Sequence, residues 1–215
     1  LAVDGEWRET RAAIVAPDVP QALEPGEARI WSVQLDPDSV YWRSLKSVTA
    51  GMASTDLSLT GVGLPDPGAT DCEAMACALA RVISQSGHAP VALDDRIAGI
   101  CGKLRAELPE RLELNSLAQS VGLSSSRLTH LFRQETGVPL RRFLLHLKIN
   151  RALAFWKPGI SVSRLATEAG FYDQPHLVRT ARDMFDALPS AYVAAGWFNV
   201  CRCGLDDQAL SDFSR

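Results

Sequence analysis

The side chains best suited to metal binding or nucleophilic chemistry are scattered through this sequence. Its four histidines lie far apart and form no H-E-x-x-H motif or similar ligand spacing: they are His88, His130, His146 and His176. Neither a glycine-rich phosphate loop nor a G-x-S-x-G nucleophile elbow is present. Cys201 and Cys203 could bind a soft metal or sense oxidation, although incidental thiols in a C-terminal tail are the simpler interpretation. We therefore expect no catalytic residue, no metal site and no cofactor.

The composition is that of a folded protein with reduced cysteines. The chain has 215 residues, of which 47% are hydrophobic, and this fraction is too high for a disordered chain. Five cysteines at irregular spacing are a poor disulfide framework. No stretch approaches the roughly 18 consecutive apolar residues of a membrane-spanning helix, and the charged residues 1–11 do not resemble a secretory signal. A soluble, cytoplasmic protein is expected.

Charge is distributed unevenly along the chain. The segment from Asp94 to Ala195 contains 14 Lys and Arg against 10 Asp and Glu, whereas the rest contains 8 against 15. A basic segment joined to an acidic one is typical of proteins in which one part faces nucleic acid. The overall net charge of −3 argues against indiscriminate binding of polyanions.

The N-terminal half is predicted to contain short strands followed by a helix. Residues 8–35 combine short apolar runs with turns, which favours strands, and a short helix is expected at 39–47. The loop signal at 61–68 comprises two prolines and three glycines. A helix at 71–84 is indicated by apolar residues at helical spacing, and Gly-His-Ala-Pro at 87–90 marks the boundary between the halves.

The C-terminal half is predicted to be helical throughout, because apolar residues recur at helical spacing between capping residues and glycines. The expected helices are one with Ile97, Ile100 and Leu104 on its apolar face that ends near Pro109, Leu114 to Val121, Ser124 to Gly137, Phe143 to Trp156, one after Ser161, and Asp173 to about Phe185. The fourth of these is apolar on nearly every side, which is typical of a helix buried between neighbours.

A seven-residue pattern occurs twice in this half, 48 residues apart. Leu117 to Leu123 reads Leu-Ala-Gln-Ser-Val-Gly-Leu, and Leu165 to Phe171 reads Leu-Ala-Thr-Glu-Ala-Gly-Phe. A capping residue follows each glycine (Ser124 and Asp173), and a leucine follows four residues after each cap. The alanine permits close helix crossing, the glycine supplies positive φ, and the leucine packs the second helix on the first. The pattern predicts two helix-turn-helix units, each able to present its second helix to a DNA major groove.

Further motifs lie around this repeat: Phe132-Arg-Gln-Glu-Thr-Gly137, Asp173-Gln174-(x)-His176-Leu177-(x)-Arg179 and Leu188-Pro-Ser-Ala-Tyr192. With them, residues 96–192 resemble the AraC/XylS family of bacterial transcription regulators. The resemblance implies an α+β, mainly α fold, with a C-terminal bundle of about seven helices in which a long buried helix joins the two helix-turn-helix units. Family members insert two recognition helices into successive major grooves, about 34 Å apart. One departure is Glu113, at a cap position where Ser, Thr or Asp is preferred.

The resemblance also implies which residues read bases. In the first unit they are Ser126, Thr129 and His130, and in the second they are Gln174, Pro175, His176 and Arg179. Gln can pair bidentately with adenine and Arg with guanine, whereas the candidates in the first unit are shorter. We therefore expect the second unit to supply more of the direct readout.

Phosphate contacts are expected from basic side chains and from the free N–H groups at two helix starts. The candidates are Ser124, Arg127, Arg133, Arg141, Arg142, Lys148, Asp173 and Arg182. Such contacts would make the affinity fall steeply with salt. For each single basic residue, a solvated surface charge is the alternative interpretation.

The N-terminal half resembles the later strands of a small cupin-type sensor barrel, which family members often carry ahead of the DNA-binding half. The similarity rests on residues 16–23 and 33–37, where Gln21 occupies a place often held by His and so removes one metal ligand or effector contact. The segment is short for a closed barrel, so we expect a partial, β-rich domain with one or two helices. The helix at 71–84 could pair between protomers or pack on its own domain.

Together these observations predict a one-component transcription regulator, not an enzyme. Residues 1–90 would form a partial cupin-like sensor or dimerisation domain, 91–195 the double helix-turn-helix domain and 196–215 a tail. The expected partners are double-stranded DNA and RNA polymerase, and a small-molecule effector and a homodimer are possible. No membrane is expected. The protein would be located in the bacterial cytoplasm, at the nucleoid. The alternative is a cupin-type metal-binding enzyme, or a metal or redox sensor, with a helical appendage. The lack of clustered His and Glu ligands weighs against it.

Overall fold

The computed structural model describes residues 1–3, 5–17, 19–24, 35–39, 42–43, 52, 54–56, 92–157 and 159–185. The chain divides between Ala92 and Leu93 into two compact units, which are described separately below. Several predicted features lie outside the described residues. They are strand residues 28–34, most of the 39–47 helix, the 61–68 loop, the 71–84 helix, the 87–90 boundary, the 188–192 motif, the tail and all cysteines except Cys101.

The N-terminal unit contains a small antiparallel β-structure. One sheet has the order β2-β1-β4, and a second pairs β3 with β5. The strands are β1 (Ala2–Val3), β2 (Glu6–Trp7), β3 (Ala13–Val15), β4 (Gln21–Ala22) and β5 (Ser54–Asp56). Strands β3 and β4 lie in the segment where strands were predicted. The others are two or three residues long, too short for an alternating pattern to reveal them.

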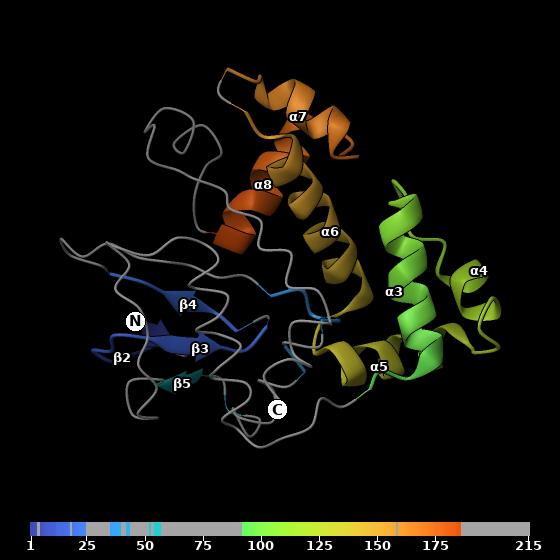
Figure 1. Ribbon diagram of the computed structural model, residues 1–215, viewed down its shortest axis with the longest axis horizontal. Helices are drawn as coiled ribbons and strands as arrows, with labels where there is room; N and C mark the ends of the chain where they lie inside the picture. The colour runs from blue at the N-terminus through green and yellow to red at the C-terminus, as the bar shows by residue number, and fades with distance from the viewer. Residues whose placement is uncertain are drawn as a thin grey trace, which may run out of the picture. The chain divides into compact units, whose positions relative to one another are not determined.

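The C-terminal unit consists of helices in its described residues, 93–157 and 159–185 (Figure 1). They are α3 (Asp95–Glu107), α4 (Leu114–Gln119), α5 (Ser125–Thr136), α6 (Leu140–Phe155), α7 (Val162–Glu168) and α8 (Gln174–Phe185). The helix face predicted for α3 is confirmed, since Ile97, Ile100 and Leu104 are buried. The number of about seven helices stays a prediction.

Two helix ends differ from the sequence-based expectation. Helix α4 ends at Gln119, two residues before Val121, because the chain already turns toward Gly122 there. Helix α6 begins at Leu140, three residues before the predicted Phe143. Its first turn contains two arginines, so the apolar run that suggested the boundary begins later than the helix itself.

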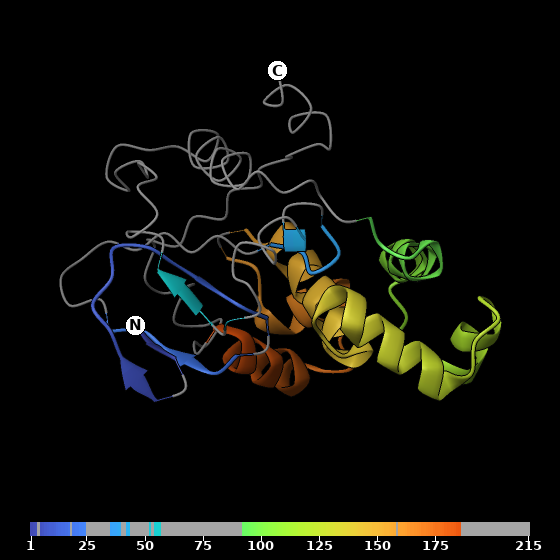
Figure 2. The same cartoon turned by 90° about the horizontal axis from the view of Figure 1, so that it is seen from below.

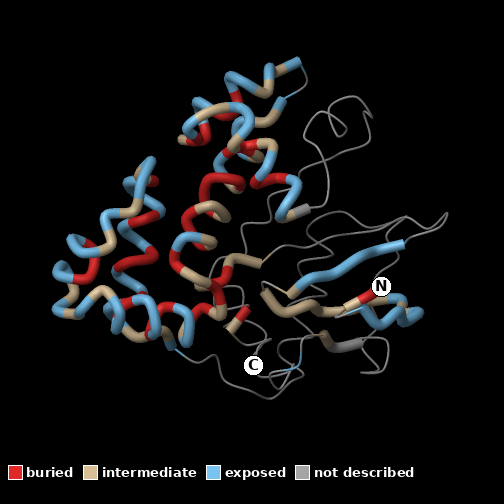
Figure 3. The backbone as a smooth tube through the Cα atoms, turned by 180° about the vertical axis from the view of Figure 1, so that it is seen from behind, coloured by how far each residue is buried: buried red, intermediate tan, exposed pale blue. Residues whose placement is uncertain are grey.

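Helix α6 joins two separate hydrophobic cores. Its first half contributes Phe143 and Leu147 to a core with α3, α4 and α5, and its second half contributes Ile149 and Ala152 to a core with α7 and α8. Figures 1 and 2 show α3 and α8 on opposite sides of α6. Buried segments of the tube in Figure 3 accordingly follow α6 along its length. The helix is not buried on every side, however, because Phe155 is 41% exposed.

Candidate nucleic-acid interface

The turns of the two helix-turn-helix units are built by the same hydrogen bonds. The Leu123 N–H donates to the Ala118 carbonyl oxygen at 2.9 Å, and the Phe171 N–H donates to the Ala166 carbonyl oxygen at 2.9 Å. Within these turns Gly122 and Gly170 have φ of +68° and +77°, a region that glycine enters without a Cβ penalty. The sequence repeat is therefore also a structural repeat.

Each second helix begins at a side-chain cap. The Ser124 hydroxyl accepts a hydrogen bond from the Arg127 N–H at 3.3 Å, and the Asp173 carboxylate accepts one from the His176 N–H at 2.7 Å. Both predicted caps are confirmed. Because each cap occupies one N–H of the first turn, fewer of these groups are free for an anion than the sequence implied. Leu128, four residues after the first cap, is fully buried, as expected for a helix packed on its partner.

Six of the seven predicted base-reading residues have exposed side chains on the second helices. The six are Ser126, Thr129 and His130 on α5 and Gln174, Pro175 and Arg179 on α8. The Thr129 hydroxyl donates to the Ser125 carbonyl oxygen at 2.8 Å and so keeps only acceptor capacity. The seventh, His176, is half-buried, with its ring edge-on to Phe171 at a centroid distance of 5.2 Å.

The predicted phosphate-contacting residues fall into three groups by exposure. Ser124, Arg127, Arg133, Arg141 and Arg182 are exposed, Arg142 and Asp173 are half-buried, and Lys148 is buried. An Arg142 N–H lies 3.4 Å from the Asp183 carbonyl oxygen, which joins the first turn of α6 to the last turn of α8. The exposed arginines are those whose charge is available to a ligand.

Lys148, for which the sequence predicts a phosphate contact, is buried in the structure. Its side chain is 1% exposed, and its Nζ donates to the Glu110 carbonyl oxygen at 3.1 Å. Burial lowers the pKa of Lys148, and the nearby Glu110 carboxylate partly offsets that effect. The ammonium group is thus used inside the protein. The sequence could not reveal this, because the residues that cover α6 at this point are distant along the chain.

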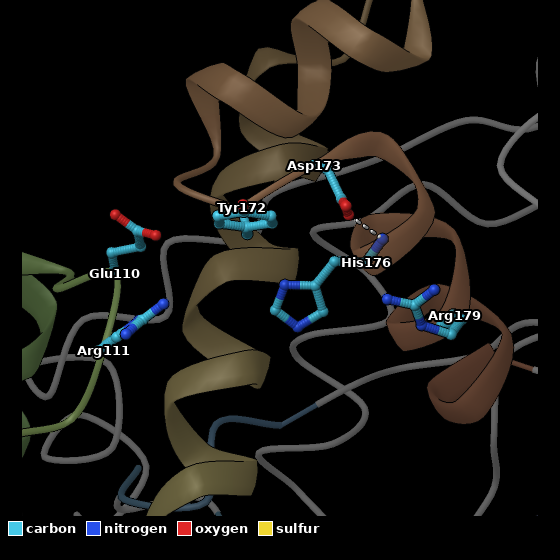
Figure 4. A pocket seen from close by; sticks show the side chains of 6 residues that line it. All are labelled: Glu110, Arg111, Tyr172, Asp173, His176 and Arg179. Atoms are coloured by element: carbon cyan, nitrogen blue, oxygen red, sulfur yellow. Dashed lines mark hydrogen bonds between the residues drawn. The ribbon is translucent and has the colours of Figure 1, made fainter.

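Tertiary structure also brings residues to α8 that the sequence did not single out. An open cavity of about 330 Å³ lies between the loop after α3 and the start of α8, and it is lined by Glu110, Arg111, Tyr172, Asp173, His176 and Arg179. Figure 4 shows the His176 ring between the Arg111 and Arg179 side chains. Arg111 is exposed and adds positive charge beside two predicted readers. Its sequence context, a loop between helices, contained no signal for this role.

In the part of the chain that the structure describes, no three or more His, Cys, Asp or Glu residues lie together in a group that could hold a metal ion. No helix formed by these residues has the length and apolar character needed to cross a membrane.

Comparison with known proteins points to the same region. Residues 117–195 match a family described as "Helix-turn-helix domain". Over 115 residues the chain is 31% identical to the arabinose operon regulatory protein of Salmonella typhimurium, covering 53% of this chain and 40% of that protein. The Escherichia coli protein of the same name is 31% identical over 116 residues, covering 53% and 39% respectively. This chain thus spans about two fifths of the length of these curated relatives.

One of the solved structures similar to this chain is that of a transcriptional regulator with an AraC-type DNA-binding domain from Chromobacterium violaceum. It is 25% identical, with a TM-score of 0.43, and the match covers 49% of this chain and 96% of that one. The assignment of this region rests on the family match, the curated relatives and the repeated turn geometry. Residues 117–195 of this chain are a helix-turn-helix domain, and over about half of its length the chain is similar to arabinose operon regulatory proteins.

Proposed function

We propose that this protein is a sequence-specific DNA-binding transcription regulator that inserts α5 and α8 into adjacent major grooves of one duplex. The observation that carries the proposal is the repeated turn, in which Leu123 and Phe171 make matching hydrogen bonds to Ala118 and Ala166. Each turn is followed by a capped helix with an exposed outer face. An α-helix fits the major groove, so two such faces joined by one helix suit two grooves.

Direct readout would come mainly from α8. Gln174 and Arg179 are exposed and can form bidentate hydrogen bonds with adenine and guanine. On α5, Ser126, Thr129 and His130 would read bases with shorter side chains. Among the α8 candidates, Pro175 would contribute apolar contact, and the half-buried His176 would contribute less than its exposed neighbours.

Phosphate contacts would orient the protein on the duplex without reading its sequence. The exposed basic side chains on or near the two helices support this role: Arg111, Arg127, Arg133, Arg141 and Arg182. The half-buried Arg142 and the helix starts at Ser124 and Asp173 would add weaker contacts.

The remaining parts of the proposal concern the whole protein. Residues 1–90 would be a partial cupin-like sensor or dimerisation domain, for which the antiparallel strands are the support. Residues 91–195 would bind DNA, and 196–215 would form a tail. The regulator would bind a small-molecule effector, form a homodimer and contact RNA polymerase. It would work in the bacterial cytoplasm, at the nucleoid.

Selection of duplexes from a random-sequence library tests the proposal. The expected product is a sequence with two conserved half-sites about one helical turn apart, both protected on one face in footprinting. A double variant, Gln174→Ala with Arg179→Ala, should lose preference for one half-site. Lys103→Ala is the matched control, since it removes an exposed charge from α3, which is not a reading helix. Equal binding of the selected duplex and a shuffled duplex would contradict the proposal.

A further inference from the structure

We propose that Lys148 is a positioning residue that holds the two reading helices at a set angle by tying both helix-turn-helix units to α6. The inference rests on the proposed function, because the angle matters only if both helices engage one duplex. Lys148 lies near the middle of α6, where the two hydrophobic cores adjoin.

Two segments distant in sequence, one from each unit, meet at this side chain. Its Nζ donates to the Glu110 carbonyl oxygen, at 3.1 Å, in the loop that follows α3 in the first unit. The same ammonium lies 6.0 Å from the centre of the Phe171 ring, in the turn of the second unit. A Cβ built on Gly170 would lie 3.8 Å from the Leu108 carbonyl oxygen and 3.9 Å from Lys148 Cε. Lys148, which belongs to the helix that joins the units, therefore lies against both of them.

Each unit packs on its own half of α6, and Lys148 adds a polar link between the two. Their apolar cores are separate, and each is completed by a different half of α6. Two linked binding modules gain affinity when the link holds them in the geometry that their target requires. If Lys148 holds the two units at a fixed angle, it would raise the effective concentration of one reading helix at its groove once the other helix has bound.

Burial of this lysine is difficult to explain as packing alone. A charged ammonium with a 1% exposed side chain is expensive to desolvate, and an apolar residue of similar length would fill the space at lower cost. The lowered pKa of Lys148 is consistent with that desolvation. What an apolar residue cannot supply is the hydrogen bond to the Glu110 carbonyl oxygen and the attraction to the Phe171 ring.

The test is Lys148→Met, which keeps the length of the side chain and removes the ammonium. Two probes are used with the full chain: the duplex selected from a random-sequence library, and the same duplex with one half-site scrambled. We expect the affinity for the intact duplex to fall about tenfold, whereas the affinity for the scrambled duplex stays unchanged. Arg151→Met is the matched control on the exposed side of α6 and should change neither affinity. Equal losses on both duplexes would overturn the inference.

A second measurement does not depend on DNA. Spin labels introduced as unnatural amino acids at Gln134 on α5 and Asp183 on α8, both exposed, report the distance between the two helices. The distance distribution should broaden in Lys148→Met at unchanged helical content, and an unchanged distribution would refute the positioning role. If Lys148→Met does not fold, Phe171→Leu, which removes the ring beside the ammonium, serves in the distance measurement. If the library yields no preferred duplex, the proposed function fails, and the distance measurement still decides the role of Lys148.

Discussion

Glu113 and Ser161 occupy equivalent positions 48 residues apart, at the starts of α4 and α7, but only Ser161 caps its helix. The Ser161 hydroxyl accepts a hydrogen bond from the Arg164 N–H at 3.2 Å, whereas Glu113 makes no side-chain cap bond. The backbone differs accordingly, with ψ of 143° at Ser161 and 77° at Glu113. The first unit therefore lacks one stabilising contact that its repeat possesses.

Glu113→Ser should stabilise the protein, because a serine can satisfy an N–H of the first turn of α4. The expected gain in the free energy of unfolding is up to about 1 kcal/mol, measured by urea denaturation. Ser161→Ala is the reciprocal variant and should lose about 1 kcal/mol. A loss of stability in Glu113→Ser would show that the backbone at this position cannot adopt the capping conformation.

Substitution of either turn glycine should destabilise its unit through the backbone. Gly122→Ala and Gly170→Ala would each place a Cβ at positive φ, at a cost of roughly 1–2 kcal/mol. A Cβ at Gly122 meets nothing within 4 Å, and one at Gly170 meets only ordinary contacts, so the two losses should be similar. Gly102→Ala in α3, with open space around it and no positive φ, is the control and should gain about 0.5–1 kcal/mol.

The two reading helices should differ in their share of specificity. Arg179→Ala is expected to reduce discrimination at one base pair by about 10- to 100-fold, because a bidentate contact with guanine is lost. Thr129→Ala should have a smaller effect, since that hydroxyl is already bonded to the Ser125 carbonyl oxygen. Competition binding with single-base variants of the selected duplex measures both. Equal losses at the two half-sites would contradict the predicted asymmetry.

The salt dependence of DNA binding should distinguish exposed basic side chains from the buried Lys148. Arg182→Gln is expected to reduce the slope of log affinity against log salt concentration by about 1, as for the loss of one phosphate contact. Lys148→Met should leave the slope unchanged, because its ammonium is bonded inside the protein. The comparison requires binding isotherms at several salt concentrations. A reduced slope for Lys148→Met on the duplex with one half-site scrambled, where positioning plays no part, would mean that the ammonium does reach the DNA.

Acid stability should depend on Asp94, the cap of α3. Its hydrogen bond and ion pair with Arg96 lower its pKa from 3.8 to about 2, so its ionised form favours the folded state. This contribution is complete above about pH 4 and is lost as the pH falls toward 2. Asp94→Asn keeps a capping side chain without the charge. The stability difference between wild type and variant should therefore shrink across that range, as followed by thermal unfolding, and a constant difference would contradict the assignment.

Much of the helical unit could be predicted because its signals are local. The period of Leu128, Leu131 and Phe132 identified the buried face of α5, and Ser124 and Gly137 identified its ends. Caps and positive-φ glycines act within a few residues of themselves, so they can be read without knowing the rest of the fold. The repeated turn is local in the same sense, which is why the sequence alone indicated two units of the same construction.

Other features were decided by tertiary structure. Lys148 and the exposed Arg151 are both basic residues of α6, and nothing in their sequence context separates them. Lys148 is buried because the loop at Glu110, 38 residues away, packs over it, and the same loop brings Arg111 to α8. The sequence thus determined which residues form helices, which residues cap the helix ends and which helix faces are apolar. Which charged side chains remain available to a ligand depended on long-range packing, because burial is set by neighbours that helical periodicity does not identify.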